Sequence, residues 1–137
     1  MHRSPIQVYL VDDEPSVGSA YARLFRSAKM QPHVFRSVEE FMSANCPDDH
    51  ACVICDVRLN GTSGLDLPLL LEKAGRKLPV ILVSAYDTPE VRETARRVGA
   101  AAFFRKPVDD QALLDAIEWA LTKWPGPVPV SSSAPAK

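Results

Sequence analysis

The alternation of two kinds of apolar segment constrains the fold of this chain more than any other feature. Five short runs rich in β-branched residues are separated by longer segments whose apolar residues recur at helical spacing. The short runs span residues 6–11, 32–35, 51–55, 79–83 and 101–104. Runs of this length are typical of strands, and strands that alternate with helices build a parallel sheet. The pattern predicts an α/β fold, a doubly wound (βα)5 sandwich around a five-stranded parallel sheet.

The intervening segments carry helix signals. Apolar stripes are formed by Val17, Ala20, Tyr21, Leu24, Phe25 and Ala28 in the first segment and by Leu113, Ala116, Ile117, Ala120 and Leu121 in the last. Ser37 and Glu40 have capping-box spacing, and Asp109 or Asp110 is the expected N-cap of the last helix. Because a proline beyond the first turn removes a backbone hydrogen bond, Pro68 predicts a third helix that starts late or bends.

Length and charge limit the class of protein. The chain has 137 residues, and we expect one domain at 1–124 followed by a Pro-, Ser- and Ala-rich tail or linker at 125–137. Its 16 basic and 17 acidic residues give a net charge of -1, which supplies no general field for attracting nucleic acid. No apolar run approaches the ~18 residues of a membrane span, and no secretory signal precedes the first strand. We expect a cytoplasmic protein that binds neither nucleic acid nor membrane directly.

Polar side chains follow four of the five predicted strands. Asp12 and Asp13 follow the first strand, Asp56 the third and Ser84 the fourth, while Lys106 comes shortly after the fifth. Ligands of open parallel sheets bind beyond the carboxyl ends of the strands, so we expect these side chains to meet at one edge. Each residue alone has an ordinary explanation as a helix cap, a turn residue or a surface lysine. Together, the crowded carboxylates predict a bound divalent cation, because their mutual repulsion would otherwise be uncompensated.

The predicted cation and its neighbours suggest phosphoryl chemistry. Mg²⁺ is usually held by one or two carboxylates together with waters and phosphate oxygens. Asp56 is the best candidate nucleophile, since aspartyl phosphates are a known covalent form and neighbouring carboxylates can hold the metal. Ser84 could donate a hydrogen bond to a phosphoryl oxygen, and Lys106 could form an ion pair with it.

These segments resemble the receiver domain of two-component response regulators over roughly residues 6–122. The resemblance rests on the segments 8–14, 55–56, 83–85 and 99–107 of this sequence. It is closest to receivers that precede a helix-turn-helix output domain of the FixJ or NarL type, although no such output domain is present. The resemblance implies a flavodoxin-like, CheY-like fold with strand order 2-1-3-4-5.

The resemblance also implies a role for each site residue. Asp56 would accept a phosphoryl group from a sensor histidine kinase or a phosphotransfer protein, and the change would alter binding of a downstream protein. Mg²⁺ or Mn²⁺ would be bound by Asp13, Asp56 and the backbone carbonyl of Arg58, with Asp12 acting through a water. Ser84, Lys106 and Phe103 would form the switch, and the peptide bond before Pro107 would be cis. A homodimer through the fourth helix, fifth strand and fifth helix is possible in such proteins.

Some positions depart from the family pattern. The loop 59–64 replaces the Met-Pro of many receivers, and its glycines indicate a mobile cover over the site. Arg58 and Tyr86 stand two residues after Asp56 and Ser84, where their side chains would flank the phosphoryl group. We hypothesise that Arg58 and Tyr86 screen the acyl phosphate from water and lengthen its life.

Other readings of the sequence stay open or are disfavoured. A Mg²⁺-dependent phosphatase or phosphotransferase with an aspartyl nucleophile, a phosphorylation-independent interaction module and a fragment of a longer regulator are the alternatives. Apart from self-phosphorylation and self-dephosphorylation, we expect no enzymatic activity. Cys52 and Cys55 have C-x-x-C spacing, but residues three apart in a strand point to opposite faces. We therefore expect buried thiols rather than a metal or redox centre, and a solvated helix face for Arg92, Arg96 and Arg97.

Overall fold

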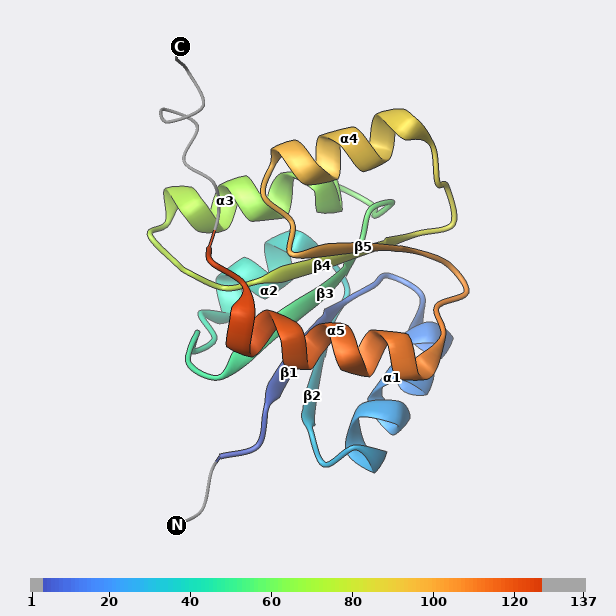
Figure 1. Ribbon diagram of the computed structural model, residues 1–137, viewed down its shortest axis with the longest axis vertical. Coiled ribbons are helices and arrows are strands. Elements are labelled where there is room, and N and C mark those ends of the chain that lie inside the picture. The colour runs from blue at the N-terminus through green and yellow to red at the C-terminus, as the bar shows by residue number, and fades with distance from the viewer. Residues whose placement is uncertain (1–3, 127–137) are drawn as a thin grey trace.

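Five parallel strands form a single sheet in the computed structural model, which describes residues 4–126 (Figure 1). The strands are β1 Gln7–Val11, β2 Gln31–Phe35, β3 Ala51–Asp56, β4 Val80–Ser84 and β5 Ala102–Arg105. Their order across the sheet is β2-β1-β3-β4-β5, and every neighbouring pair is parallel. Both the predicted α/β class and the predicted strand order are confirmed. Residues 127–137, most of the expected tail, lie outside the described residues.

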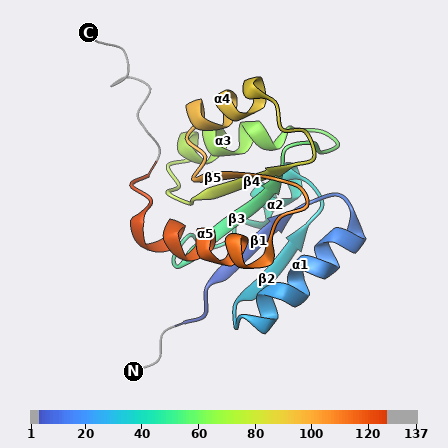
Figure 2. The same ribbon diagram turned by 45° about the vertical axis from the view of Figure 1, so that its right-hand side comes forward.

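Helices cover both faces of the sheet. They are α1 Pro15–Ser27, α2 Val38–Ala44, α3 Leu67–Lys73, α4 Pro89–Arg97 and α5 Asp110–Lys123, with a short 3₁₀ turn, η1, at Gly64–Asp66. Buried side chains of α2, α3 and α4 join one apolar cluster, and those of α1 and α5 join the other. The two views of the ribbon show helices on both sides of the sheet (Figures 1 and 2). The sheet is therefore buried on both sides, which explains why β3 and β4 have no exposed residue.

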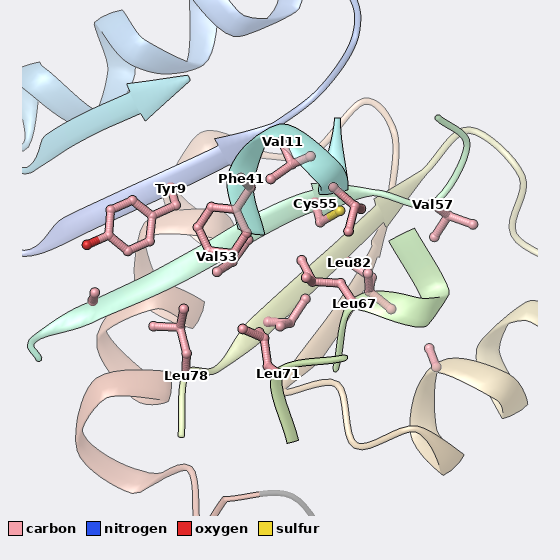
Figure 3. Packing of buried hydrophobic residues seen from close by; sticks show 14 residues of the cluster. Tyr9, Val11, Phe41, Val53, Cys55, Val57, Leu67, Leu71, Leu78 and Leu82 are labelled. Atoms are coloured by element: carbon pink, nitrogen blue, oxygen red, sulfur yellow. The ribbon is translucent and has the colours of Figure 1, made fainter. Parts of the chain in front are cut away.

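The cluster beneath α2 and α3 shows how strand alternation builds the core (Figure 3). Tyr9 and Val11 of β1 point into it together with Val53 and Cys55 of β3. Cys52, between Ala51 and Val53, belongs to the opposite cluster. The two cysteines of the C-x-x-C sequence thus lie on opposite faces of the sheet, as strand geometry predicts, and no shared metal or redox centre can use both.

The helix boundaries follow local hydrogen bonding. Ser37 Oγ accepts the Glu40 N–H at 2.9 Å at the start of α2, and Asp109, rather than Asp110, caps α5 by accepting the Ala112 N–H at 2.9 Å. Pro68 lies in the first turn of α3, after the η1 turn. A proline is tolerated there because the first-turn N–H groups have no partner within the helix. The late start predicted for this helix is confirmed.

The stripe predicted for α1 needs a correction. Ala20 is exposed, and the buried residues of the helix are Gly18, Ala22 and Phe25. A Cβ atom at Gly18 would lie 3.0 Å from Val34 Cγ1, so the small residues of α1 face β2 and let the two elements approach closely. Phe25 is buried, and Tyr21, Leu24 and Ala28 pack against the same apolar cluster, so most of the predicted stripe is confirmed. Ala20 was wrongly included, and Gly18 was not predicted as a packing residue.

Within residues 4–126, no helix combines the length and the apolar character that a membrane crossing requires.

Candidate functional site

The carboxyl ends of four strands bring the predicted site residues to one edge of the sheet. Asp56 and Ser84 are the last residues of β3 and β4, and Asp12 and Lys106 follow β1 and β5 directly. Asp56 lies opposite Val83 in the register of β3 and β4, one residue before Ser84. All three acidic or hydroxyl side chains are buried, with exposed fractions of 2% for Asp12, 8% for Asp56 and 0% for Ser84.

The Lys106 ammonium group bridges two of the buried carboxylates. Its Nζ atom lies 2.6 Å from Asp56 Oδ2 and 3.2 Å from Asp12 Oδ2. Burial acts to lower the pKa of Lys106, but the hydrogen bond and charge of Asp56, followed by those of Asp12, outweigh it and raise the pKa overall. Burial raises the pKa of Asp12, with the Glu14 N–H and Lys106 opposing the rise. The site therefore holds a lysine that stays protonated between two desolvated carboxyl groups.

Backbone N–H groups hold other oxygens of the acidic residues. The Arg58 N–H donates to Asp56 Oδ1 at 3.0 Å, and the Glu14 N–H donates to Asp12 Oδ1 at 2.9 Å. The Asn60 N–H donates to Asp13 Oδ2 at 3.1 Å. Each bond fixes the orientation of its carboxylate, so the site is preorganised for a ligand that carries positive charge.

The donor set fits Mg²⁺, although residues 4–126 contain no ready-made cluster of three His, Cys, Asp or Glu ligands. Mg²⁺ is rarely enclosed by protein ligands and usually keeps several waters. The carboxylate oxygens of Asp12, Asp13 and Asp56 at this edge of the sheet are the hard oxygen donors that the ion prefers. The bridging ammonium of Lys106 supplies the positive charge between Asp12 and Asp56 in this structure.

The Ser84 hydroxyl is connected to its surroundings through the backbone. Ser84 Oγ accepts the Tyr86 N–H at 3.0 Å, which ties the hydroxyl to the loop before α4. The Lys106 N–H donates to the Ser84 carbonyl oxygen at 2.8 Å, and the peptide bond between Lys106 and Pro107 is cis. A movement of Ser84 would therefore displace both the β4–α4 loop and the segment that carries Lys106.

Arg58 and Tyr86 come together at the rim of the site. The guanidinium carbon of Arg58 lies 4.0 Å from the centroid of the Tyr86 ring, which is a close cation–π contact. Tyr86 is 53% exposed, so the stacked pair faces solvent rather than the core. Two residues that are far apart in the sequence, each two positions after Asp56 or Ser84, thus contact each other.

Phe103 lies on β5 and is half-buried against the cluster that contains Leu82, its register partner on β4. The guanidinium carbon of Arg92 is 4.9 Å from the centroid of the Phe103 ring. The same guanidinium group pairs with Asp87 in the β4–α4 loop. The expectation that Arg92 belongs to a simple solvated face was incomplete, because this side chain links the loop after Ser84 to the aromatic ring on β5.

The loop 59–64 is held to its neighbours, which its glycine content did not indicate. Glu39 of α2 accepts hydrogen bonds from both the backbone N–H and the hydroxyl of Thr62. The Gly64 N–H donates to the Val57 carbonyl oxygen at 3.0 Å. These bonds, with the Asn60 N–H on Asp13, hold the loop beside the site.

Gly64 and Glu39 are positioning residues that sequence reasoning missed. A Cβ atom at Gly64 would lie 2.1 Å from the carbonyl oxygen of Asp56, so only glycine allows the loop to pass this close to the candidate phosphoacceptor. A glycine shortly after the third strand was the only available signal in the sequence. Nothing in the sequence pairs Glu39 with Thr62, because the two lie on different elements.

Known proteins resemble the chain in sequence. The transcriptional regulatory protein TdiR of Thauera aromatica is 40% identical over 114 residues, which cover 83% of this chain and 50% of that protein. The transcriptional regulatory protein FixJ of Azorhizobium caulinodans is 32% identical over 116 residues, covering 85% of this chain and 55% of that protein. The chain therefore spans about half the length of these curated relatives.

Solved structures have the same fold. The response regulator StyR matches with a TM-score of 0.74 and 31% identity, over 86% of this chain and 60% of that one. The structure of FixJ-N matches with a TM-score of 0.78 at 24% identity, over 87% of this chain and 95% of that one, and supports the fold alone. The family model of the response regulator receiver domain matches residues 8–118. The chain belongs to the response regulator receiver domains, the family that serves two-component signal transduction.

Proposed function

We propose that Asp56 accepts a phosphoryl group from a phosphohistidine of a sensor histidine kinase or a phosphotransfer protein. The observation that carries this proposal is the Asp56 carboxylate at the end of β3. It is buried, is held by the Arg58 N–H on one oxygen and by Lys106 on the other, and has Ser84 one strand away. Receiver domains work with histidine kinases, and this arrangement gives the phosphoryl group both an acceptor and groups to bind it.

The transfer makes one bond and breaks one. A carboxylate oxygen of Asp56 attacks phosphorus, and the P–N bond to the donor imidazole breaks. The product is an acyl phosphate, and the donor histidine leaves as a neutral imidazole because its other ring nitrogen carries a proton. Lys106 Nζ, now 2.6 Å from Asp56 Oδ2, would pair with a phosphoryl oxygen. The cation would thus follow negative charge from the carboxylate to the phosphoryl group.

Mg²⁺ or Mn²⁺ would be held by Asp13, Asp56 and the Arg58 carbonyl, with Asp12 acting through a water. When bound, the ion neutralises charge on the phosphoryl oxygens. The protein's own contribution is orientation: the Asn60 N–H on Asp13 and the Glu14 N–H on Asp12 aim the carboxylates.

The switch would run from Ser84 to Phe103. To donate its proton to a phosphoryl oxygen, the Ser84 hydroxyl would move toward Asp56, and its bond from the Tyr86 N–H would lengthen or break. The β4–α4 loop also holds Asp87, whose partner Arg92 lies over the Phe103 ring. Added phosphoryl charge of about -1.5 to -2 would therefore bias the α4–β5 surface through contacts that this structure contains.

The proteins that bind this chain are expected to contact the surface formed by α4, β5 and α5. We infer a downstream protein or a second copy of the chain that contacts α4, β5 and α5 in the phosphorylated state. Two of the relatives are transcriptional regulatory proteins, and the region matched by this chain makes up 50% and 55% of their lengths. For this chain we propose a switch that has no phosphatase activity on external substrates and no direct contact with nucleic acid, with residues 1–124 as the receiver and 125–137 as a tail or linker.

Intact mass spectrometry tests the proposal. The chain is incubated with acetyl phosphate and Mg²⁺, beside Asp56→Asn and beside a sample with chelator. One phosphoryl increment that requires both Mg²⁺ and Asp56 is the expected result. An increment that persists in Asp56→Asn would reject Asp56 as the acceptor, and turnover of an external phosphomonoester would favour a phosphatase instead.

The Arg58–Tyr86 pair is expected to lengthen the life of the acyl phosphate. The contact between the two side chains, two residues beyond Asp56 and Ser84, supports this role, and we expect removal of either side chain to admit water to the phosphorus. We expect phosphoryl half-lives several-fold shorter in Arg58→Ala and in Tyr86→Ala, and no further shortening in the double variant because the two act as one cover. Half-lives equal to that of the unmodified sequence would refute this role.

A further inference from the structure

A groove lies between α1 and the edge of the sheet that β2 forms. It has a volume of about 550 Å³ and runs along one face of α1, past the end of β2, to the start of α2. α1 lies beside β2, the edge strand of the sheet (Figure 2). Gly18 and Ala22 line the groove with Val34, which is 45% exposed although it is a β-branched residue in a strand.

The side chains around this floor are basic. Arg23 and Arg26 of α1 and Arg36 after β2 line the groove and are exposed. The ion pairs within residues 4–126 use Arg76, Arg92, Arg96 and Lys106 as their cations, so the three groove arginines take no part in them. The α4 arginines Arg92 and Arg96, by contrast, are already neutralised by Asp87 and Glu93.

Acidic groups in the groove do not cancel this charge. Glu40 accepts the Arg36 N–H at 2.8 Å, and Asp12 at the inner end pairs with Lys106. Among the lining residues, the three arginines thus have no ion-pair partner, and Glu40 is the one carboxylate without a cationic partner. The groove combines a small apolar floor with a net positive rim on a chain whose overall net charge is -1.

We propose that this α1–β2 groove docks an acidic segment of a partner protein that places an apolar side chain on Val34 and carboxylates on Arg23, Arg26 and Arg36. Charge complementarity identifies the occupant, since arginine binds carboxylates through its planar fork of N–H donors. A short groove with an apolar floor suits a peptide better than a duplex, whose binding requires phosphate contacts along an extended basic surface. The docking goes beyond the phosphoryl switch and does not require phosphorylation of Asp56.

Fluorescence anisotropy on the full chain tests the proposal. The probe is a fluorescein-labelled amphipathic peptide with leucine at helical spacing and glutamate at the other positions. The double variant Arg23→Gln with Arg26→Gln is expected to weaken binding by about tenfold, because two charged contacts are lost. The matched control, Lys73→Gln with Arg97→Gln, removes two exposed cations from helices on the opposite face of the sheet and should leave binding unchanged.

Further measurements distinguish binding in the groove from binding elsewhere on the protein. Peptide-induced NMR shifts centred on Ala22 and Val34 would support the groove, and binding retained in Asp56→Asn would show that docking is independent of the phosphoryl switch. Undetectable binding, equal weakening in both double variants, or equal binding of a peptide with lysine in place of glutamate would overturn the proposal. Displacement of the peptide by a DNA duplex of the same charge would also overturn it.

Discussion

Replacing Gly64 by alanine should disturb the candidate phosphoacceptor more than any other single-methyl change. The added Cβ would lie 2.1 Å from the Asp56 carbonyl oxygen, 2.9 Å from its carbonyl carbon and 3.0 Å from Cys55 Sγ. Ordinary contact begins at 3.4 Å, so the loop and the end of β3 must separate by roughly 1.3 Å. No rotamer change relieves this contact, because two of the three atoms belong to the backbone.

The expected loss of stability is large because the backbone atoms around the added methyl group cannot rotate away from it. Overpacking in a well-packed region costs about 1–3 kcal/mol, and we expect the upper end, since the strand end is buried. That loss corresponds to a melting temperature lower by roughly 10 °C for a domain of this size. A displacement of ~1 Å at a reacting group can slow a reaction by about 10²-fold, so phosphorylation of Asp56 should slow by a similar factor.

Gly75→Ala is the matched control for this prediction. Gly75 has a positive φ of 72° but no atom within 4 Å of an added Cβ, so the variant carries backbone strain of about 1 kcal/mol without a clash. Thermal unfolding and the rate of phosphorylation by acetyl phosphate are measured for both variants. If Gly64→Ala has the same melting temperature as Gly75→Ala and is phosphorylated as fast as the unmodified sequence, the close backbone approach at Gly64 does not have the proposed effect.

Three further predictions concern charge and burial. With chelator present, Lys106→Met should lose about 3 kcal/mol of stability, because Asp12 and Asp56 lose their cation. Added Mg²⁺ should restore most of this stability in thermal unfolding, and a loss that Mg²⁺ does not change would contradict the prediction. Burial, followed by the charges of Cys46 and Asp48, raises the pKa of Tyr9 from 10.0 to about 12. The folded state keeps a proton on Tyr9 that the unfolded chain releases. The free energy of unfolding relative to Tyr9→Phe should therefore be constant below pH 10.0 and fall as the pH rises to about 12; denaturant titrations that give the same pH dependence of this free energy for both chains would exclude it. Burial raises the pKa of Cys52 to about 12 and also raises that of Cys55, so iodoacetamide should modify at most Cys46 in the folded protein, with all three cysteines reacting after denaturation; mass spectra showing modified Cys52 in folded protein would disagree.

The predicted site residues could be located because strand and site are adjacent in the sequence. Asp56 and Ser84 end their strands, and Asp12 follows its strand directly, so predicting the strands also predicted where the side chains meet. Lys106 follows by the same rule. The parallel topology then predicted that these side chains lie together, since it places the carboxyl ends of the strands at one edge of the sheet.

What the sequence could not supply depends on contacts between distant segments. The Glu39 bonds to Thr62 and the Asn60 N–H bond to Asp13 join elements whose relative position is set only by packing. The packing role of Gly18 in α1 was missed for the same reason, because it depends on how closely the helix approaches Val34. Apolar periodicity finds the apolar residues of a buried helix face but gives no sign of a glycine that lies within that face.

Reductive trapping of the acyl phosphate tests the central claim most directly. Borohydride reduces an aspartyl phosphate to homoserine and releases phosphate, so it marks the residue that carried the phosphoryl group. The chain is phosphorylated with acetyl phosphate and Mg²⁺, reduced, digested and mapped by mass spectrometry, beside an unphosphorylated sample. We expect homoserine at position 56 alone, and homoserine at position 12 or 13, or at none, would show that Asp56 is not the phosphoacceptor.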